Sequence, residues 1–365
     1  MGSFVAEGLV VPVAVIDRLV EALLAADVPL ERGALETAVR EVAAVEAPLA
    51  KPDELLAAVD ALVGLGPLEP LLRDPSVSDV LVNRFDDVWV ERDGVLVPTE
   101  VTFPDAAAVV AAVERMIAPL GLRLDRASPA VDARLPDGSR LHAIIPPVAV
   151  DGPVVAIRRF TDAVGDLDEL VARGGIEPQG ARLLAEVVGE RRNVLVAGQT
   201  GSGKTTLLNV LARAVPADQR VVTVEDAAEL AFPGHVIRLE ARAKNAEGFG
   251  EVTMRTLLRH ALRLRPDRIV VGEVRGAEAL DMVQALGTGH RGSMSTIHAS
   301  GPATALARLE MLASSAERPV DADVLRRQIR TIVDVVVFMV RDEGTRRVRS
   351  IVEVDVDGLD EVYPC

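Results

Sequence analysis

One eight-residue segment constrains the fold more than any other part of the chain. Its residues are Gly198, Gln199, Thr200, Gly201, Ser202, Gly203, Lys204 and Thr205. An apolar strand predicted over Asn193–Ala197 precedes the segment, and a helix predicted over Thr206–Ala214 follows it. Glycines let backbone N–H groups curve around phosphate oxygens, and a helix N-terminus adds partial positive charge. The segment therefore matches a Walker A phosphate loop.

This loop predicts a site for a nucleoside triphosphate with Mg²⁺. We expect residues 198–205 and Thr206 to hold the phosphates, with Lys204 reaching the β- and γ-phosphates. The hydroxyl of Thr205 is the expected magnesium ligand. The chain has only three lysines, Lys51, Lys204 and Lys244, so a chance match that includes one is rare.

Carboxylates and a histidine follow three further predicted strands. The strand Arg220–Val224 ends in Glu225, Arg268–Val271 ends in Gly272 and Glu273, and Ser293–Ile297 ends in His298. Carboxylates at the C-terminal ends of such strands can orient and deprotonate a water molecule. Glu273 occupies the Walker B position, where a carboxylate holds Mg²⁺ through water. His298 stands where a γ-phosphate sensor would lie.

Changes of pattern along the chain predict its organisation. Residues 1–62 are expected to form helices, residues 63–161 a small α+β (PAS-like) domain, and residues 162–170 an acidic linker. Residues 171–365 alternate helices with short apolar strands, which indicates a largely parallel sheet covered on both faces. The predicted fold class is α/β, a RecA-like P-loop NTPase core behind a smaller N-terminal domain and a leading helical segment.

Composition excludes several classes of protein. Hydrophobic residues make up 49% of 365 residues, which excludes intrinsic disorder by composition, and aromatics are only 2%, which disfavours stacking on bases. The net charge is -15, and most of it lies in residues 1–150, which disfavours a broad nucleic-acid-binding face. The one cysteine, Cys365, excludes an internal disulfide or a cysteine zinc site, and no apolar run is long enough to span a membrane. We also expect no secretory signal at the start.

Taken together and in this order, four segments resemble the secretion ATPases of type II and type IV systems. They are the phosphate loop, the acidic box Thr223–Leu230, the segment Leu264–Gly276 and the histidine box Thr288–Ala299. Within this group, the chain most resembles the pilus-assembly ATPases of tight-adherence (Flp/Tad-type) systems. The residues that carry this finer likeness are Asp132–Arg140, Asn245–Glu251 continuing to Arg255, and Gly289–Ala299. The resemblance runs from about Gly64 to Leu312, and the flanking regions are unspecific.

The resemblance implies a homo-hexameric ring driven by ATP and Mg²⁺. Glu225 would be the general base, Glu273 the magnesium residue and His298 the phosphate sensor. The family also supplies arginines from the smaller domain to the γ-phosphate, for which Arg134, Arg140 and Arg158 are the candidates here. It implies a cytoplasmic location at the inner face of the membrane, against polytopic inner-membrane platform proteins.

Two other functions remain open at this point. A conjugation-type or other nucleic-acid motor uses the same fold, although the low aromatic content and the acidic first half argue against it. A nucleotide-gated scaffold that hydrolyses nothing is the third reading, and the two intact acidic boxes argue against it.

Overall fold

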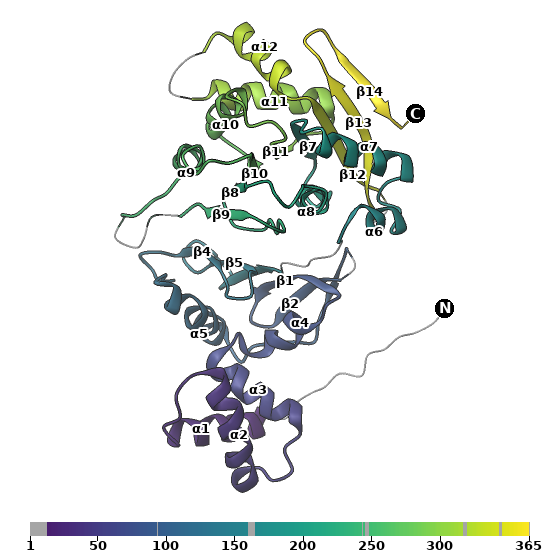
Figure 1. The fold of residues 1–365 in the computed structure, drawn as a ribbon. Helices are drawn as coiled ribbons and strands as arrows, with labels where there is room; N and C mark the ends of the chain where they lie inside the picture. The colour runs from purple at the N-terminus through teal and green to yellow at the C-terminus, as the bar shows by residue number, and fades with distance from the viewer. Residues whose placement is uncertain are drawn as a thin grey trace. The chain divides into compact units, whose positions relative to one another are not determined.

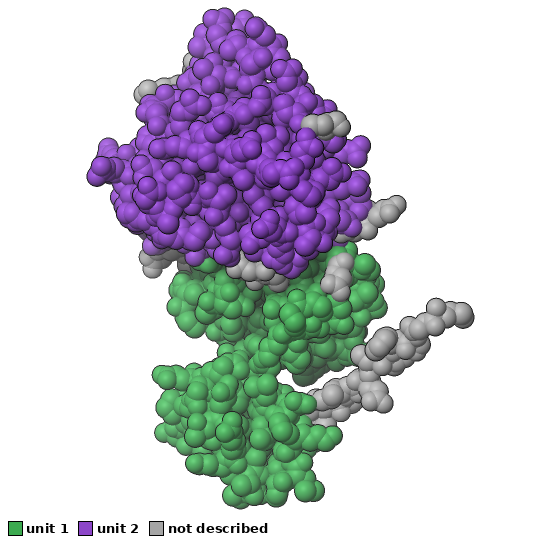
Figure 2. Space-filling model, turned by 45° about the vertical axis from the view of Figure 1, so that its right-hand side comes forward, with its two compact units in different colours: residues 1–161 green, residues 162–365 purple. Residues whose placement is uncertain are grey.

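The computed structural model describes residues 13–92, 94–159, 165–242, 244, 248–316, 320–342 and 345–364. The chain divides into two compact units, residues 1–161 and 162–365 (Figure 2). Some predicted features fall outside the described residues: residues 162–164 of the expected linker, Asn245 and Cys365.

The first unit begins with three helices that share a small core. They are α1 (Val13–Ala25), α2 (Arg32–Glu46) and α3 (Pro52–Val63). Apolar side chains at helical spacing, such as Leu19 and Leu23 on α1 and Leu35 and Val39 on α2, are buried together. The three helices agree with the helical pattern that the sequence shows before residue 63.

A six-stranded antiparallel sheet forms the rest of the first unit. Its order is β3-β2-β1-β6-β5-β4. One core lies between the sheet and α5, to which the helix contributes Val109, Val113 and Ile117. Asp105 begins α5, because its side chain accepts a hydrogen bond from the backbone N–H of Ala108 at 2.8 Å. The strands are β1 (Val77–Arg84), β2 (Asp87–Arg92), β3 (Val95–Pro98), β4 (Ala130–Arg134), β5 (Arg140–Ile144) and β6 (Val154–Arg158), and the helical elements are η1 (Gly66–Leu68), α4 (Glu69–Arg73), α5 (Ala106–Ile117) and η2 (Ala118–Leu120).

The second unit is built on an eight-stranded sheet of order β14-β13-β12-β7-β11-β10-β8-β9 (Figure 1). The six strands from β12 to β9 in this order are parallel, and β13 and β14 continue the sheet antiparallel. The strands are β7 (Val194–Gly198), β8 (Val221–Glu225), β9 (Val236–Glu240), β10 (Arg268–Val274), β11 (Met294–His298), β12 (Val335–Asp342), β13 (Thr345–Val354) and β14 (Leu359–Tyr363).

Helices cover both faces of this sheet, each over its own apolar core. One face packs against α9, α10, α11 and α12, and the other against α6, α7 and α8. Side chains alternate along β7, so that Val194 and Val196 enter one core while Leu195 and Ala197 enter the other. The helices are α6 (Leu167–Ala172), α7 (Pro178–Gly189), α8 (Lys204–Ala212), α9 (Met254–Ala261), α10 (Glu278–Gly287), α11 (Pro302–Ser314) and α12 (Ala322–Ile332).

The predicted fold class is confirmed, and a few element boundaries are wrong. The helix after the phosphate loop begins at Lys204 rather than Thr206, and α6 begins inside the expected linker. β9 is a half-buried edge strand rather than a strand buried on both faces. The region after Leu312, which the sequence leaves unspecific, adds β12, β13 and β14 to the sheet.

Candidate functional site

The phosphate loop connects the C-terminal end of β7 to the N-terminus of α8. Gly201 and Gly203 have φ angles of 73° and 93°, a region that side chains with a Cβ rarely adopt. The ammonium of Lys204 is buried and donates a hydrogen bond to the carbonyl of Gln199 at 3.0 Å, which draws the lysine across the loop. The N-cap residue of α8 is Gly203, which has no side chain to bond the first backbone N–H groups of the helix. This is the arrangement that binds phosphate at a helix N-terminus.

Position 198 requires glycine, because two neighbouring residues approach it closely. A Cβ on this residue would lie 2.4 Å from the Ser202 hydroxyl and 2.7 Å from the carbonyl oxygen of Met339 on β12. Only glycine fits there without moving the loop or the adjacent strand. The start of the phosphate loop is therefore set by contact with β12 as well as by its own turn.

Glu273 lies in a β-bulge at the end of β10. The register between β10 and β11 shifts between Val271 and Val274, and the Thr296 hydroxyl donates a hydrogen bond to the Gly272 carbonyl at 2.6 Å. A bulge of this kind redirects a side chain at a strand end. Here it directs Glu273 to a position 2.8 Å from Nε2 of His298 and 2.7 Å from a guanidinium nitrogen of Arg275.

His298 ends β11 beside the phosphate loop. It is paired in register with Gly198, the last residue of β7 and the first of the loop. Lys204, Glu273, Arg275 and His298 also influence one another electrostatically, so the structure gathers them at one edge of the sheet. Sequence reasoning missed Arg275, although it stands two residues beyond Glu273 in a segment already singled out.

Burial changes the pKa values of Lys204 and His298. Burial lowers the pKa of the Lys204 ammonium, and the charge of Arg275 lowers it further, while Glu273 acts in the opposite direction. Burial also lowers the pKa of His298, with the charge of Lys204 next in effect. His298 is therefore neutral at pH 7 and can accept a hydrogen bond at one ring nitrogen.

Glu225 ends β8 in a tight, buried position. Its side chain is 2% exposed, and Oε1 accepts hydrogen bonds from the backbone N–H groups of Glu229 and Leu230, both at 2.8 Å. A Cβ on Gly272 of the neighbouring strand would lie 2.9 Å from Cγ of Glu225. Burial raises the pKa of this carboxyl, against the lowering effect of the two backbone hydrogen bonds.

Several buried polar atoms at this edge of the sheet have no hydrogen-bond partner among the described residues. They are Oγ of Ser202, Oε2 of Glu225 and Oε1 of Glu273. The last is close to His298, but the angles are outside hydrogen-bond geometry. Buried polar atoms normally find partners, so these groups fit a polar ligand that carries its own donors and acceptors. The Thr205 hydroxyl and the Glu273 carboxylate are oxygen donors of the kind that Mg²⁺ takes.

Arg134, Arg140 and Arg158 form one row in the first unit. Arg134 on β4 pairs directly with Arg140 on β5, and Arg140 pairs with Arg158 on β6. Directly paired residues of an antiparallel sheet lie on the same face, so the three side chains share it. Arg158 also pairs with Asp79 on β1, and its Nε donates to that carboxylate at 2.8 Å. The sequence identified these arginines one by one, and the register aligns them.

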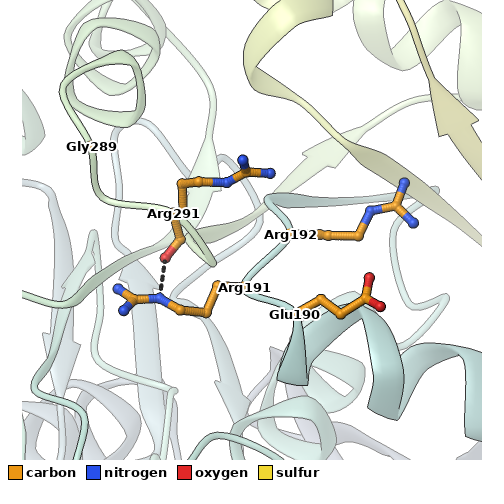
Figure 3. A pocket seen from close by; sticks show the side chains of 5 residues that line it. All are labelled: Glu190, Arg191, Arg192, Gly289 and Arg291. Atoms are coloured by element: carbon orange, nitrogen blue, oxygen red, sulfur yellow. Dashed lines mark hydrogen bonds between the residues drawn. The ribbon is translucent and has the colours of Figure 1, made fainter.

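A separate cavity of about 490 Å³ lies on the second unit, lined by Glu190, Arg191, Arg192, Gly289 and Arg291 (Figure 3). These residues precede β7 and β11, so the cavity is at the amino-terminal edge of the parallel strands, opposite the phosphate loop. Arg191 donates to the carbonyls of Asp267 at 2.8 Å and of Arg291 at 3.3 Å, and Arg192 pairs with Glu353. These contacts join the ends of neighbouring elements at this edge of the sheet.

Comparison with known proteins identifies the family. A model described as "Type II/IV secretion system protein" matches residues 61–355. A putative conjugal transfer protein of Mycobacterium tuberculosis, Rv3659c, is 46% identical over 294 residues, covering 78% of this chain and 83% of its own. The conjugal transfer protein TrbB of Rhizobium radiobacter is 34% identical, covering 78% and 85%. The type IV secretion system protein VirB11 of Brucella suis is 32% identical, covering 75% and 84%.

Among solved structures, the pilus retraction motor PilT with bound ADP matches with a TM-score of 0.54. It is 18% identical, and the match covers 82% of this chain and 83% of that one. At this identity the likeness concerns the fold, and it agrees with a RecA-like core behind an N-terminal domain. Within the described residues, no helix is both long enough and apolar enough to cross a membrane.

The predicted resemblance is confirmed at the level of the family, and with it the prediction of an ATPase. The matched region reaches residue 355, so it includes most of the C-terminal strands that the sequence leaves unspecific. The relatives at 46% and 34% identity are named for conjugal transfer, and the finer likeness to tight-adherence systems stays a prediction. The chain belongs to the type II/IV secretion system protein family.

Proposed function

We propose that this chain hydrolyses Mg²⁺-ATP in a homo-hexameric ring and thereby powers a transport machine in the cell envelope. The observation that carries the proposal is the buried Lys204 on its phosphate loop, beside Glu273 and His298. A buried ammonium next to uncapped helix N–H groups suits a polyphosphate, because the phosphate charge compensates the buried cation.

Residues Gly198, Gln199, Thr200, Gly201, Ser202, Gly203, Lys204, Thr205 and Thr206 bind the phosphates in this proposal. Thr205 and Glu273 would hold Mg²⁺, Glu273 through water. The ion supplies positive charge that neutralises the phosphate oxygens. Glu273 is suited to this task because the bulge in β10 aims it and Arg275 donates a hydrogen bond to one of its carboxylate oxygens.

Glu225 is the proposed general base. It accepts a proton from the attacking water while the water oxygen bonds to the γ-phosphorus and the bond to the β-phosphate bridging oxygen breaks, which leaves ADP and inorganic phosphate. Its Oε2 has no hydrogen-bond partner among the described residues. Burial raises its pKa toward the operating pH, and this improves proton transfer.

His298 is the proposed γ-phosphate sensor, and Arg134, Arg140 and Arg158 are the proposed arginines that stabilise the γ-phosphate. A neutral His298 can hydrogen-bond Glu273 or a phosphate, and so responds to loss of the phosphate. Arg134, Arg140 and Arg158 bring three guanidinium groups to one face of the sheet. Arginine forks of this kind stabilise the charge of a γ-phosphate during its transfer.

The transport machine is proposed to be a pilus-assembly or protein-secretion system of tight-adherence type. The ring would act at the cytoplasmic face of the cell membrane on polytopic inner-membrane platform proteins. A conjugation-type machine is the second candidate, because the relatives with 46% and 34% identity carry conjugal transfer names. Stimulation of turnover by single-stranded DNA would favour a direct nucleic-acid motor, and its absence would favour the protein-transport role.

The central test is ATP turnover by the purified chain, with Mg²⁺ and after its removal by EDTA. Lys204→Ala and Glu273→Ala are expected to abolish turnover, and Lys244→Ala is the matched control, because Lys244 is exposed and lies 3.9 Å from Glu251. Unchanged turnover in both site variants would end the proposal. Light scattering with an ATP analogue tests for the hexamer.

A second test addresses the arginine row. Arg134→Ala is expected to spare ADP binding and to lower turnover about tenfold or more, because its contact is made to the transferred phosphate. Arg123→Ala, an exposed arginine 3.5 Å from Asp125 in the same unit, serves as control. Equal loss of binding and turnover in Arg134→Ala would assign it a structural role instead.

A further inference from the structure

The β12–β13 hairpin places two arginines beside the phosphate loop. Along β12, the alternate residues Val335, Val337 and Met339 point into the core that α8 covers. Arg341 is next in this row. Its direct partner on β13 is Arg346, so both side chains lie on the α8 face of the hairpin. The row thus changes from apolar to cationic as β12 continues past the end of β7.

The change from apolar to cationic residues along β12 occurs beside the start of the phosphate loop. Met339 pairs with Gly198, where β7 ends and the loop begins, and β12 runs three residues further to Asp342. A Cβ on Gly201 would lie 3.5 Å from a guanidinium nitrogen of Arg341. A Cβ on Gly203 would lie 3.4 Å from Cδ of Arg346. Both arginines therefore reach the positions at which backbone N–H groups are predicted to hold phosphate.

The two arginines approach from the side away from Glu273 and His298. In the sheet, β7 lies between β12 and β11, and β10 lies beyond β11. Glu273 on β10 and His298 on β11 are the residues proposed for the magnesium ion and the γ-phosphate. A group that comes from β12 lies on the other flank of the loop, away from the residues proposed for the magnesium ion and the γ-phosphate.

We propose that Arg341 and Arg346 bind the α- and β-phosphates of the nucleotide. The proposal rests on the proposed function, because it assigns further binding residues to the same site. Guanidinium groups recognise phosphate oxygens through two-pronged, charge-assisted hydrogen bonds. Since these phosphates are common to ATP and ADP, the two arginines hold the nucleotide before and after hydrolysis. Arg134, Arg140 and Arg158 differ, because they are proposed to contact the γ-phosphate, which ADP lacks.

The test measures the Kd of Mg²⁺-ADP and of a slowly hydrolysed ATP analogue by calorimetry. In Arg341→Ala/Arg346→Ala, both Kd values are expected to rise by the same factor, about tenfold or more. Arg341→Lys/Arg346→Lys keeps the charge and should recover part of the affinity. Arg347→Ala is the matched control, because Arg347 is on the opposite face of the hairpin, paired with Asp342.

Three results would overturn the inference. In the first, the Kd of ADP changes by less than about twofold in the double alanine variant. In the second, only the Kd of the ATP analogue rises, and in the third, Arg347→Ala raises the Kd of ADP by the same factor as the double variant. Thermal melting without nucleotide checks that each variant is folded. Failure of the proposed function is a separate outcome, in which the unmodified chain binds neither nucleotide.

Discussion

Gly272→Ala tests whether the position of Glu225 governs hydrolysis. The added Cβ would lie 2.9 Å from Cγ, 3.4 Å from Oε1 and 3.5 Å from Cβ of Glu225. Carbon atoms in good contact are about 3.5–4.0 Å apart, so Glu225 or the strand must shift by roughly half an ångström or more. The side chain has little room to give, because Oε1 is held by two backbone N–H groups at 2.8 Å.

The expected effect is large on turnover and small on binding. Overpacking of this kind costs about 1–3 kcal/mol of folding stability. Misplacement of a reacting group by up to about 1 Å lowers turnover by about ten- to a hundredfold. Nucleotide affinity should stay within about twofold, because the phosphate loop is not displaced.

The assay compares kcat for Mg²⁺-ATP with the Kd of ADP in Gly272→Ala and in a matched glycine variant. Gly301→Ala is that control, because its Cβ would meet only the Thr304 hydroxyl, at 3.8 Å. An unchanged kcat in Gly272→Ala would refute the idea that the close fit positions Glu225. Full turnover in Glu225→Gln would refute its role as base altogether.

Two further predictions concern buried charges. Arg268→Met should lower the free energy of unfolding by about 3 kcal/mol. The reason is that the fully buried Arg268 donates hydrogen bonds to the carbonyls of Val188 at 2.8 Å and Gly292 at 3.1 Å. Chemical denaturation measures the free energy of unfolding, and a loss below about 1 kcal/mol would contradict the prediction. Burial raises the pKa of the Glu225 carboxyl above 4.5, so the folded state favours the protonated form of this group. The contribution of Glu225 to folding stability is therefore present below pH 4.5 and is lost as the pH rises through the folded-state pKa. Glu225→Gln should therefore raise the melting temperature at pH 7, with a difference that shrinks toward pH 4.5; a constant difference across that range would contradict the linkage.

The sequence was sufficient for the features that depend on local pattern. The phosphate loop, the strand before it and the carboxylates after β8 and β10 could be placed, because each is a short motif with one fold context. The largely parallel core followed from apolar runs such as Val194–Ala197, since a strand buried on both faces shows no alternation.

What the sequence could not supply depends on register and on long-range contact. Nothing local to Arg134, Arg140 and Arg158 shows that three strands align them, and nothing local to Arg341 shows that it lies beside Gly201. Arg268 looks like a surface residue until it is found buried, with its pKa lowered to about 10 by burial. In each case the neighbours of the residue come from strands or loops that are distant in the sequence.

The burial of Lys204 has a practical consequence for chemical labelling. The chain has three lysines, and Lys51 and Lys244 are both on the surface. An amine-acylating reagent should modify these two side chains quickly and Lys204 only when the phosphate loop opens. The labelling rate of this one residue would therefore follow loop opening directly.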